Sequence, residues 1–176
     1  MPIYFLRHAS AGDSYKDPRK DEKRPLDEEG ALQCRYVGRA LASLGVLPDA
    51  VISSPLKRAL QTASLVGNEL GFEGKIQMDA ALRPEATFAQ FRDLLVRHKD
   101  VESILVVGHD PSLSSFLSHM VGPRNAAAHI VMKKGAVARV DTDSKQPTLQ
   151  WLLTPKAVRS IYEAATASSR PKTSRK

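Results

Sequence analysis

Residues 104–111 read ILVVGHDP, and this stretch decides the fold class. The four apolar residues, most of them β-branched, predict a short buried strand. Gly108 and His109 end that strand, and Asp110-Pro111 is typical of a helix start, with a capping side chain followed by proline at the first helical position. The stretch therefore predicts a strand that runs directly into a helix, which is the building unit of α/β proteins.

Two further stretches have the same design. Residues 50–55 read AVISSP, a short apolar strand that meets Ser54-Pro55, and residues 3–6 read IYFL. Amphipathic stretches with helical spacing separate the apolar runs, as in residues 31–44. Because strands alternate with helices along the chain, we expect a three-layer α/β/α sandwich with a mostly parallel central sheet.

The remaining elements are predicted from weaker patterns. Residues 10–29 are dense in charge and suit a surface loop over a site. Late strands near residues 135–140 and 148–153 predict a hairpin added at the sheet edge near the C-terminus. A short final helix is expected to follow Thr154-Pro155 and to end at Ile161.

Length and charge indicate one domain followed by a tail. The chain has 176 residues, 42% of them hydrophobic, which fits a single domain over residues 1–165. Residues 166–176 contain basic residues and no acid, and their composition predicts a disordered tail. The tail accounts for +4 of the net charge of +7. With only 6% aromatic residues, this distribution argues against a nucleic-acid partner.

The sequence also indicates the compartment and the cofactor needs. No apolar run approaches the roughly 20 residues that span a bilayer, and residues 1–4 do not resemble a secretory signal. We therefore expect a cytoplasmic protein that does not bind membranes. Cys34 is the single cysteine, and no cluster has metal-ligand spacing. We expect neither a metal nor another cofactor.

Basic side chains follow three of the predicted strands. Strand 3–6 ends in Arg7-His8, strand 50–53 runs into a helix whose first turn carries Arg58, and strand 104–107 ends near His109. Ligands of open α/β sheets bind beyond the carboxyl ends of the strands. If these strands are parallel neighbours, two arginines and two histidines meet in one crevice, with two helix N-termini directed at it.

This combination favours a phosphate group as ligand. Arginine matches phosphate oxygens bidentately and keeps its charge at any working pH. A histidine beside two arginines should have a lowered pKa and so present a neutral imidazole. His8 is then a candidate covalent nucleophile, and Arg7, Arg58 and His109 would bind the phosphate and stabilise charge during transfer.

The same residues resemble a known family. Residues 6–9, LRHA, resemble the Arg-His-Gly signature of the histidine phosphatase superfamily, whose members are phosphoglycerate mutase-like. Residues 53–63 resemble its second motif, and residues 107–111 resemble the segment that carries its second active-site histidine. The small SixA-type phosphohistidine phosphatases are similar in length and in residues 107–114. The resemblance implies a metal-independent phosphatase in which His8 becomes transiently phosphorylated, acting on a phosphorylated protein or a small phosphorylated metabolite.

Two positions are less regular. Ala9 stands where the family has glycine, which matters if the backbone there needs a positive φ. Many members of the superfamily protonate the leaving group with a carboxylate after the second motif, and Glu85 lies in about the right region. We predict Glu85 as a candidate general acid.

Two alternatives remain open at this stage. One is a small-molecule phosphatase or mutase of the same superfamily, although a mutase would be expected to be longer. The other is a non-catalytic module that binds phosphopeptides through the same pocket.

Overall fold

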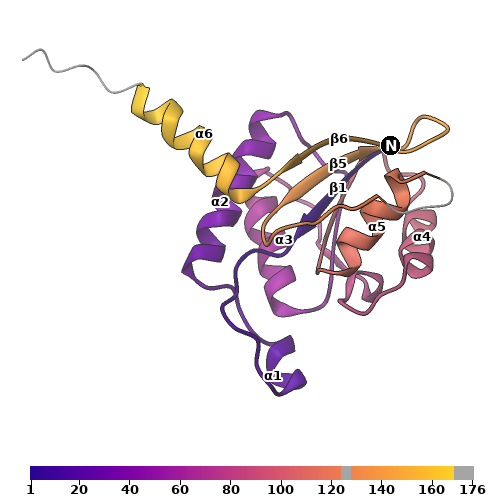
Figure 1. Cartoon of the computed structure of the whole chain (residues 1–176), viewed down its shortest axis with the longest axis horizontal. Coiled ribbons are helices and arrows are strands. Elements are labelled where there is room, and N and C mark those ends of the chain that lie inside the picture. The colour runs from indigo at the N-terminus through magenta and orange to yellow at the C-terminus, as the bar shows by residue number, and fades with distance from the viewer. Residues whose placement is uncertain (124–127, 169–176) are drawn as a thin grey trace, which may run out of the picture.

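A six-stranded sheet forms the middle layer of the computed structural model, which describes residues 1–123 and 128–168 (Figure 1). The strand order is β3-β2-β4-β1-β5-β6. The strands are β1 (Pro2–Arg7), β2 (Ala50–Ser53), β3 (Gln77–Met78), β4 (Ile104–Gly108), β5 (Val137–Asp141) and β6 (Thr148–Leu153). Strands β3, β2, β4 and β1 are parallel, whereas β5 and β6 form an antiparallel hairpin at the edge. The expected mostly parallel sheet with an edge hairpin is confirmed.

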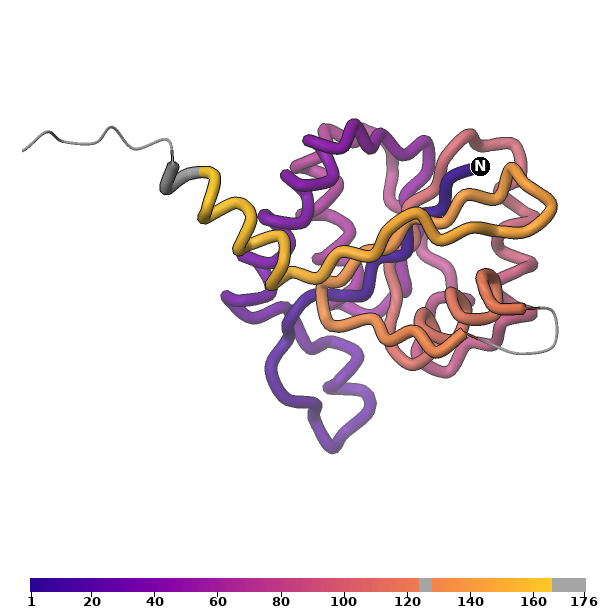
Figure 2. Tube along the Cα trace, turned by 45° about the horizontal axis from the view of Figure 1, so that its top comes forward, coloured from indigo at the N-terminus to yellow at the C-terminus, as the bar shows by residue number. Residues whose placement is uncertain are grey.

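Helices cover both faces of this sheet (Figures 1 and 2). The helices are α1 (Pro18–Glu22), α2 (Glu28–Ser43), α3 (Lys57–Glu69), the 3-10 turn η1 (Ala80–Leu82), α4 (Phe88–Arg97), α5 (Ser112–Val121) and α6 (Pro155–Ser168). One face of the sheet packs on α2 and α3, and the other packs on α4 and α5. Helix α6 lies against α2. The three-layer sandwich is therefore confirmed.

Strand β1 shows how the two cores are separated. Its side chains alternate, so that Ile3 and Phe5 enter one core while Tyr4 and Leu6 enter the other. Phe5 lies against Phe91, with ring centroids 5.4 Å apart, and all these side chains are buried. Burial of each large apolar side chain contributes about 1.5–3 kcal/mol. A strand that is buried on both faces has to be apolar throughout, which is why the sequence signal was clear.

Two predicted helix caps are wrong. Helix α3 begins at Lys57 with Leu56 as its N-cap, and α5 begins at Ser112 with Pro111 as its N-cap. Neither cap residue forms a side-chain hydrogen bond to the helix. The Ser54 hydroxyl is instead hydrogen-bonded to His109, and the Asp110 carboxylate accepts from the hydroxyl of Ser114. The Ser54 hydroxyl also accepts from the backbone N–H of Leu56, the N-cap residue, at 3.4 Å. Among the described residues, neither predicted capping side chain accepts from a backbone N–H inside its helix.

The structure contains more helix than expected in the segment 10–29 and near the C-terminus. The predicted loop 10–29 contains the short helix α1, whose N-cap Asp17 accepts from the backbone N–H of Arg19. Helix α6 continues to Ser168 instead of ending at Ile161, so the first three residues of the predicted tail are helical. The rest of that tail lies outside the described residues. Within the described part of the chain, no helix is long and apolar enough to cross a membrane.

Candidate active site

The three strand ends meet as the sequence predicts. Strand β4 lies between β1 and β2, with Arg7 in register with Gly108 and Ser53 in register with Val107. A pocket opens at this edge of the sheet, and we call it the central pocket. Its lining residues are Arg7, His8, Gly12, Ser14, Asp21, Arg24, Arg58, Pro84, His109, Asp110 and Lys134. The structure therefore brings together four of the five predicted site residues.

Backbone hydrogen bonds hold His8 in place. Its N–H donates to the carbonyl of Gly108 at 3.0 Å, which continues the β1–β4 pairing by one residue. Gly135 donates its N–H to the carbonyls of both Arg7 and His8, at 3.1 and 3.0 Å. Gly135 has a φ of +71°, a conformation that favours glycine. His8 thus follows the strand on a fixed main chain instead of lying in a free loop.

The imidazole of His8 is oriented for attack through one nitrogen. His8 is buried, and its Nδ1 lies 2.8 Å from the carbonyl oxygen of Ala9. A carbonyl can only accept, so Nδ1 carries the proton and Nε2 keeps its lone pair. Burial lowers the pKa of His8 to about 3, with smaller contributions from the charges of Arg58 and Arg7. The lowered pKa confirms the sequence expectation, although burial outweighs the arginines as its cause.

His109 faces His8 across the pocket, with ring centroids 4.9 Å apart. Its Nε2 lies 2.9 Å from the Ser54 hydroxyl, and its buried Nδ1 has no hydrogen-bond partner among the described residues. Burial lowers its pKa to about 2, and the positive charges of Arg58 and Arg7 add to the effect. If the Ser54 hydroxyl donates to Nε2, then Nδ1 carries the proton and is a free donor.

Arg7 and Arg58 are each held through Nη1, which donates to oxygen atoms of the protein. Nη1 of Arg7 donates to the carbonyl of Met132 at 2.6 Å, and Nη1 of Arg58 donates to the backbone and carboxylate oxygens of Asp21. In both side chains Nε is buried and lacks a hydrogen-bond partner among the described residues. A buried N–H without a partner is costly, and an oxyanion would satisfy it. The arrangement thus favours a ligand rich in oxygen acceptors.

The charges that line the pocket fit a phosphate group. Four cations face it, namely Arg7, Arg24, Arg58 and Lys134, against the carboxylates of Asp21 and Asp110. The excess of two positive charges matches a phosphate dianion when both histidines are neutral. Within the described residues, no group of three His, Cys, Asp or Glu side chains could hold a metal ion. The cationic side chains that line the pocket could stabilise the charge of a bound phosphate.

Glu85 lies apart from the other four predicted residues. Its carboxylate accepts from Nε of Arg83 at 2.6 Å, and the Arg83 guanidinium also pairs with Glu22. The hydrogen bond from Arg83 lowers the pKa of Glu85, which disfavours the protonated form that a general acid needs. Glu85 does not line the central pocket. Its role as the acid stays a prediction.

Ala9 replaces glycine without backbone strain. No residue other than glycine has a positive φ in the described parts of the chain. Ala9 is fully buried, and its N–H donates to the Thr62 hydroxyl at 3.1 Å. The methyl group of Ala9 therefore fits, and the backbone at this position does not need the positive φ that would favour glycine.

Sequence reasoning missed several residues of the pocket, among them the charged residues Asp21, Arg24 and Lys134. Asp21 and Arg24 lie in a charge-dense segment where no pattern distinguishes a pocket residue from a solvated one. Lys134 comes just before Gly135, whose hydrogen bonds to Arg7 and His8 bring it to the site. A glycine that precedes a predicted edge strand was the available signal, and by itself it is weak.

Comparisons with known proteins agree with this geometry. Residues 3–87 match the family model of the histidine phosphatase superfamily, branch 1. An uncharacterised protein of Picosynechococcus is 31% identical over 140 residues, which cover 78% of this chain and 82% of that protein. The phosphohistidine phosphatase SixA of Escherichia coli is 26% identical over 158 residues, which cover 88% of this chain and 94% of SixA.

Other relatives share the core but differ in length. The mitochondrial serine/threonine-protein phosphatase Pgam5 of Drosophila pseudoobscura pseudoobscura is 40% identical over 88 residues, which cover 48% of this chain and 28% of Pgam5. Among solved structures, the protein histidine phosphatase SixA complexed with tungstate superimposes with a TM-score of 0.77 at 25% identity, covering 89% of this chain and 98% of that one. Taken with the pocket geometry, these similarities show that the chain belongs to the histidine phosphatase superfamily.

Proposed function

We propose that the protein is a metal-independent phosphatase that hydrolyses phosphohistidine or a small phosphoester through a phosphorylated His8. One observation carries the proposal: the imidazole of His8, with its proton on Nδ1, shares a pocket with Arg7 and Arg58, whose buried Nε atoms have no hydrogen-bond partner among the described residues. A nucleophile beside unmet donors for oxygen is what phosphoryl transfer needs. The nucleophile, the two arginines and His109 all follow or flank neighbouring strand ends of one sheet.

In the first step Nε2 of His8 attacks phosphorus. A bond forms between Nε2 and phosphorus while the bond from phosphorus to the leaving atom breaks, and the leaving atom takes that electron pair. Arg7, Arg58 and His109 would donate hydrogen bonds to the other phosphate oxygens. The N–H at Nδ1 stays on the Ala9 carbonyl, which stabilises the positive charge that the ring gains.

In the second step water attacks the phosphorylated His8. The bond between Nε2 and phosphorus breaks, its electron pair returns to the ring, and inorganic phosphate leaves. The ring is then neutral again with its proton on Nδ1, so the enzyme is ready for another cycle. No group outside the pocket is required for the charge balance.

The leaving group favours a phosphoramidate as substrate. An alkoxide must be protonated as it leaves, and the one predicted acid, Glu85, is paired with Arg83. A phosphorylated imidazole that is protonated at its remote nitrogen leaves as a neutral molecule without any acid. The likeness to SixA supports the same choice. Phosphohistidine in a protein is therefore our first candidate, and a small phosphorylated metabolite is the second.

The test replaces the nucleophile. His8→Ala should abolish hydrolysis of a phosphohistidine peptide and of an aryl phosphate, whereas the exposed His129 provides the control His129→Ala, with unchanged turnover. Full activity of His8→Ala would contradict the assignment. Turnover of phosphoserine or a sugar phosphate in preference to phosphohistidine would favour the small-molecule alternative.

A non-catalytic phosphate-binding module is the alternative from another class. Rapid mixing with substrate and quenching in alkali should trap a phosphate on His8, detected by mass spectrometry. A module that only binds would give no phosphorylated residue. Activity should also survive a strong chelator, since the arginines supply the charge that a metal would otherwise provide. Loss of activity that only added metal restores would overturn that part of the proposal.

A further inference from the structure

Asp21 lies in the central pocket but has no role in the steps above. It belongs to α1, a helix of five residues with no buried side chain. We propose that Asp21 is a positioning residue, which fixes Arg58 so that the Nε edge of its guanidinium faces the phosphate. The inference rests on the proposed function, because that function places a phosphate at this edge.

Among the described residues, Arg58 forms its side-chain hydrogen bonds through Nη1. Its Nη1 lies 2.9 Å from the backbone oxygen of Asp21 and 3.2 Å from Oδ2 of the same residue. Arg58 is buried, with 5% of its surface exposed, and its Nε has no partner among the described residues. The five N–H groups of a guanidinium lie in one plane. Fixing Nη1 therefore fixes the direction in which the N–H of Nε points.

Asp21 is itself held firmly. Its Oδ1 accepts from the N–H of Tyr15 at 3.0 Å and from Nε of Arg24 at 2.8 Å. Arg24 is 7% exposed, and its Nη1 donates to the carbonyl of Ala11 at 2.6 Å. If the Asp21 carboxylate moved away, Nε of the buried Arg24 and Nη1 of the buried Arg58 would each lose a charged acceptor, which is costly. This network connects α1 to the pocket although α1 has no apolar anchor.

A carboxylate near a phosphate raises the question of repulsion. Asp21 shares its charge with Arg24, so the pair formed by these two side chains adds no net charge to the pocket. Asp21 also occupies Nη1 of Arg58 and leaves Nε free, so it does not compete with the ligand for the same edge. We therefore expect the gain in orientation to exceed the loss from repulsion.

Arg7 offers a parallel case on the other side of the pocket. Its Nη1 is held by a main-chain carbonyl, that of Met132, and its Nε is equally buried and unpaired within the described chain. Both arginines thus present the same edge to the pocket. Nη1 of Arg7 also lies 3.7 Å from the carboxylate of Asp110, a longer contact than those between Nη1 of Arg58 and Asp21, so substitution of Asp21 gives the clearer test.

The experiment measures binding of orthovanadate, a phosphate-like oxyanion, by calorimetry with Asp21→Ala and Asp21→Asn. We expect Asp21→Ala to weaken binding about tenfold and Asp21→Asn about threefold, because the amide keeps the shape and one acceptor. Asp13 is exposed on the same segment and supplies the matched control. Asp13→Asn removes the same charge and should change the dissociation constant by less than about twofold. The KM for an aryl phosphate should rise in parallel.

A double-mutant cycle separates positioning from loop folding. In an Arg58→Lys background the planar guanidinium is absent, so Asp21→Ala should weaken orthovanadate binding by less than about twofold further. A repeat of the full tenfold loss in that background would show that Asp21 acts through the loop, and would overturn the proposal. Tighter binding by Asp21→Ala would overturn it as well, because Asp21 would then be a competitor of the anion.

The test stays decisive in two difficult cases. If Asp21→Ala does not fold, the isosteric Asp21→Asn carries the same comparison, with its thermal midpoint measured first. Orthovanadate binding requires no turnover. Failure of the wild-type protein to hydrolyse phosphate compounds would contradict the proposed function, while the role of Asp21 in holding Arg58 would still be decided by the binding data.

Discussion

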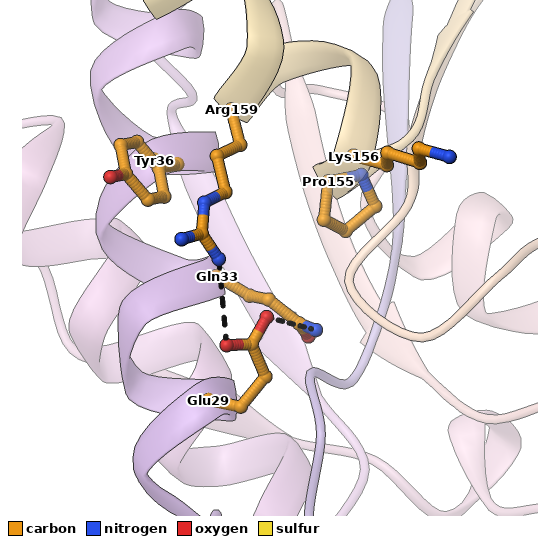
Figure 3. A pocket seen from close by; sticks show the side chains of 6 residues that line it. All are labelled: Glu29, Gln33, Tyr36, Pro155, Lys156 and Arg159. Carbon is orange, nitrogen blue, oxygen red and sulfur yellow. Dashed lines mark hydrogen bonds and ion pairs between the residues drawn. The ribbon is translucent and has the colours of Figure 1, made fainter. Parts of the chain in front are cut away.

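The central pocket and a second surface pocket between α2 and α6 both contain basic and acidic side chains, yet they differ in kind. We call the second one the α2–α6 notch, and it is lined by Glu29, Gln33, Tyr36, Pro155, Lys156 and Arg159 (Figure 3). In the notch Arg159 is 46% exposed and pairs with Glu29 and Glu163. Figure 3 shows that Lys156 points away from Glu29. In the central pocket Arg58 is buried and Arg7 is partly buried, and the buried Nε of each has no hydrogen-bond partner among the described residues.

This difference shows what makes an anion site. Exposed ion pairs such as that of Arg159 contribute little to stability because solvent screens them, and they leave no buried donor that needs a ligand. Buried guanidiniums whose Nη1 is held and whose Nε is unmet are prepared for an oxyanion before it arrives. A basic residue in a pocket is therefore weak evidence by itself. Burial combined with an unmet donor is much stronger evidence.

Removing one arginine from each region should give the largest difference between the two pockets. Arg58→Ala should lower kcat/KM for an aryl phosphate by about 10³-fold, as loss of a preorganised donor to a transition state commonly does. Arg159→Ala should change kcat/KM by less than about twofold. Steady-state kinetics of both variants provide the check. Equal losses would show that the contrast between the two pockets has no catalytic meaning.

The site residues could be predicted because they follow buried strands. The apolar runs that end in Arg7-His8 and near His109 are visible in the sequence, and parallel strands bring their carboxyl ends together. Asp21 could not be predicted in this way. Its place depends on contacts with Arg24 and Arg58, and a short charge-dense segment has no periodicity that would show which side chains turn inward.

The helix starts were mispredicted for a related reason. Ser54 and Asp110 have the residue types of N-caps, and each precedes a proline. In the structure both side chains bind other groups, His109 and Ser114, close to the central pocket. Tertiary hydrogen bonds outweigh a local capping preference that is typically about 1 kcal/mol. The preference of Ser and Asp for the N-cap position therefore gave wrong helix starts next to the candidate site.

Acid should weaken the fold through the buried histidines of the central pocket. Burial lowers the pKa of His8 to about 3 and that of His109 to about 2, whereas an unfolded histidine titrates near 6.5. Below pH 6.5 the unfolded chain thus binds more protons than the folded one. This stability is complete above pH 6.5 and is lost as the pH falls towards the folded-state pKa values, by about 1.4 kcal/mol per pH unit for each histidine.

Urea unfolding between pH 6.5 and 5 measures this effect before the carboxylates titrate. His8→Gln should show a shallower decline in the free energy of unfolding than wild type, by about the contribution of one histidine. An identical slope in the two proteins would mean that His8 is not held neutral by burial. The lining of the α2–α6 notch contains no histidine, so its ion pairs should not depend on histidine protonation. An identical slope would therefore remove one difference between the two pockets.

Gly30 tests the contact between the start of α2 and the catalytic segment. A Cβ at Gly30 would lie 2.0 Å from the backbone oxygen of Ser10, so Gly30→Ala has to displace the main chain two residues after His8. We expect a loss of about 2 kcal/mol in stability together with reduced turnover. In α3, a Cβ at Gly67 would meet nothing closer than 3.8 Å, and Gly67→Ala should be neutral or stabilising by up to about 1 kcal/mol. Thermal unfolding of both variants measures this difference in stability.

A small effect is also expected for Glu85, whose exposed ion pair resembles that of Arg159 more than the buried contacts of Arg58. Its side chain is 66% exposed and shares an ion pair with Arg83 outside the central pocket. Glu85→Gln should therefore lower kcat for an aryl phosphate by no more than about threefold, because an exposed pair contributes little and a carboxylate with a lowered pKa is a poor proton donor. A loss of a hundredfold or more, confined to substrates with poor leaving groups, would show that Glu85 leaves Arg83 during turnover and protonates the leaving oxygen. In that case exposure and ion pairing in the structure would not suffice to exclude a residue from catalysis, and phosphoesters would become the better candidates for the substrate.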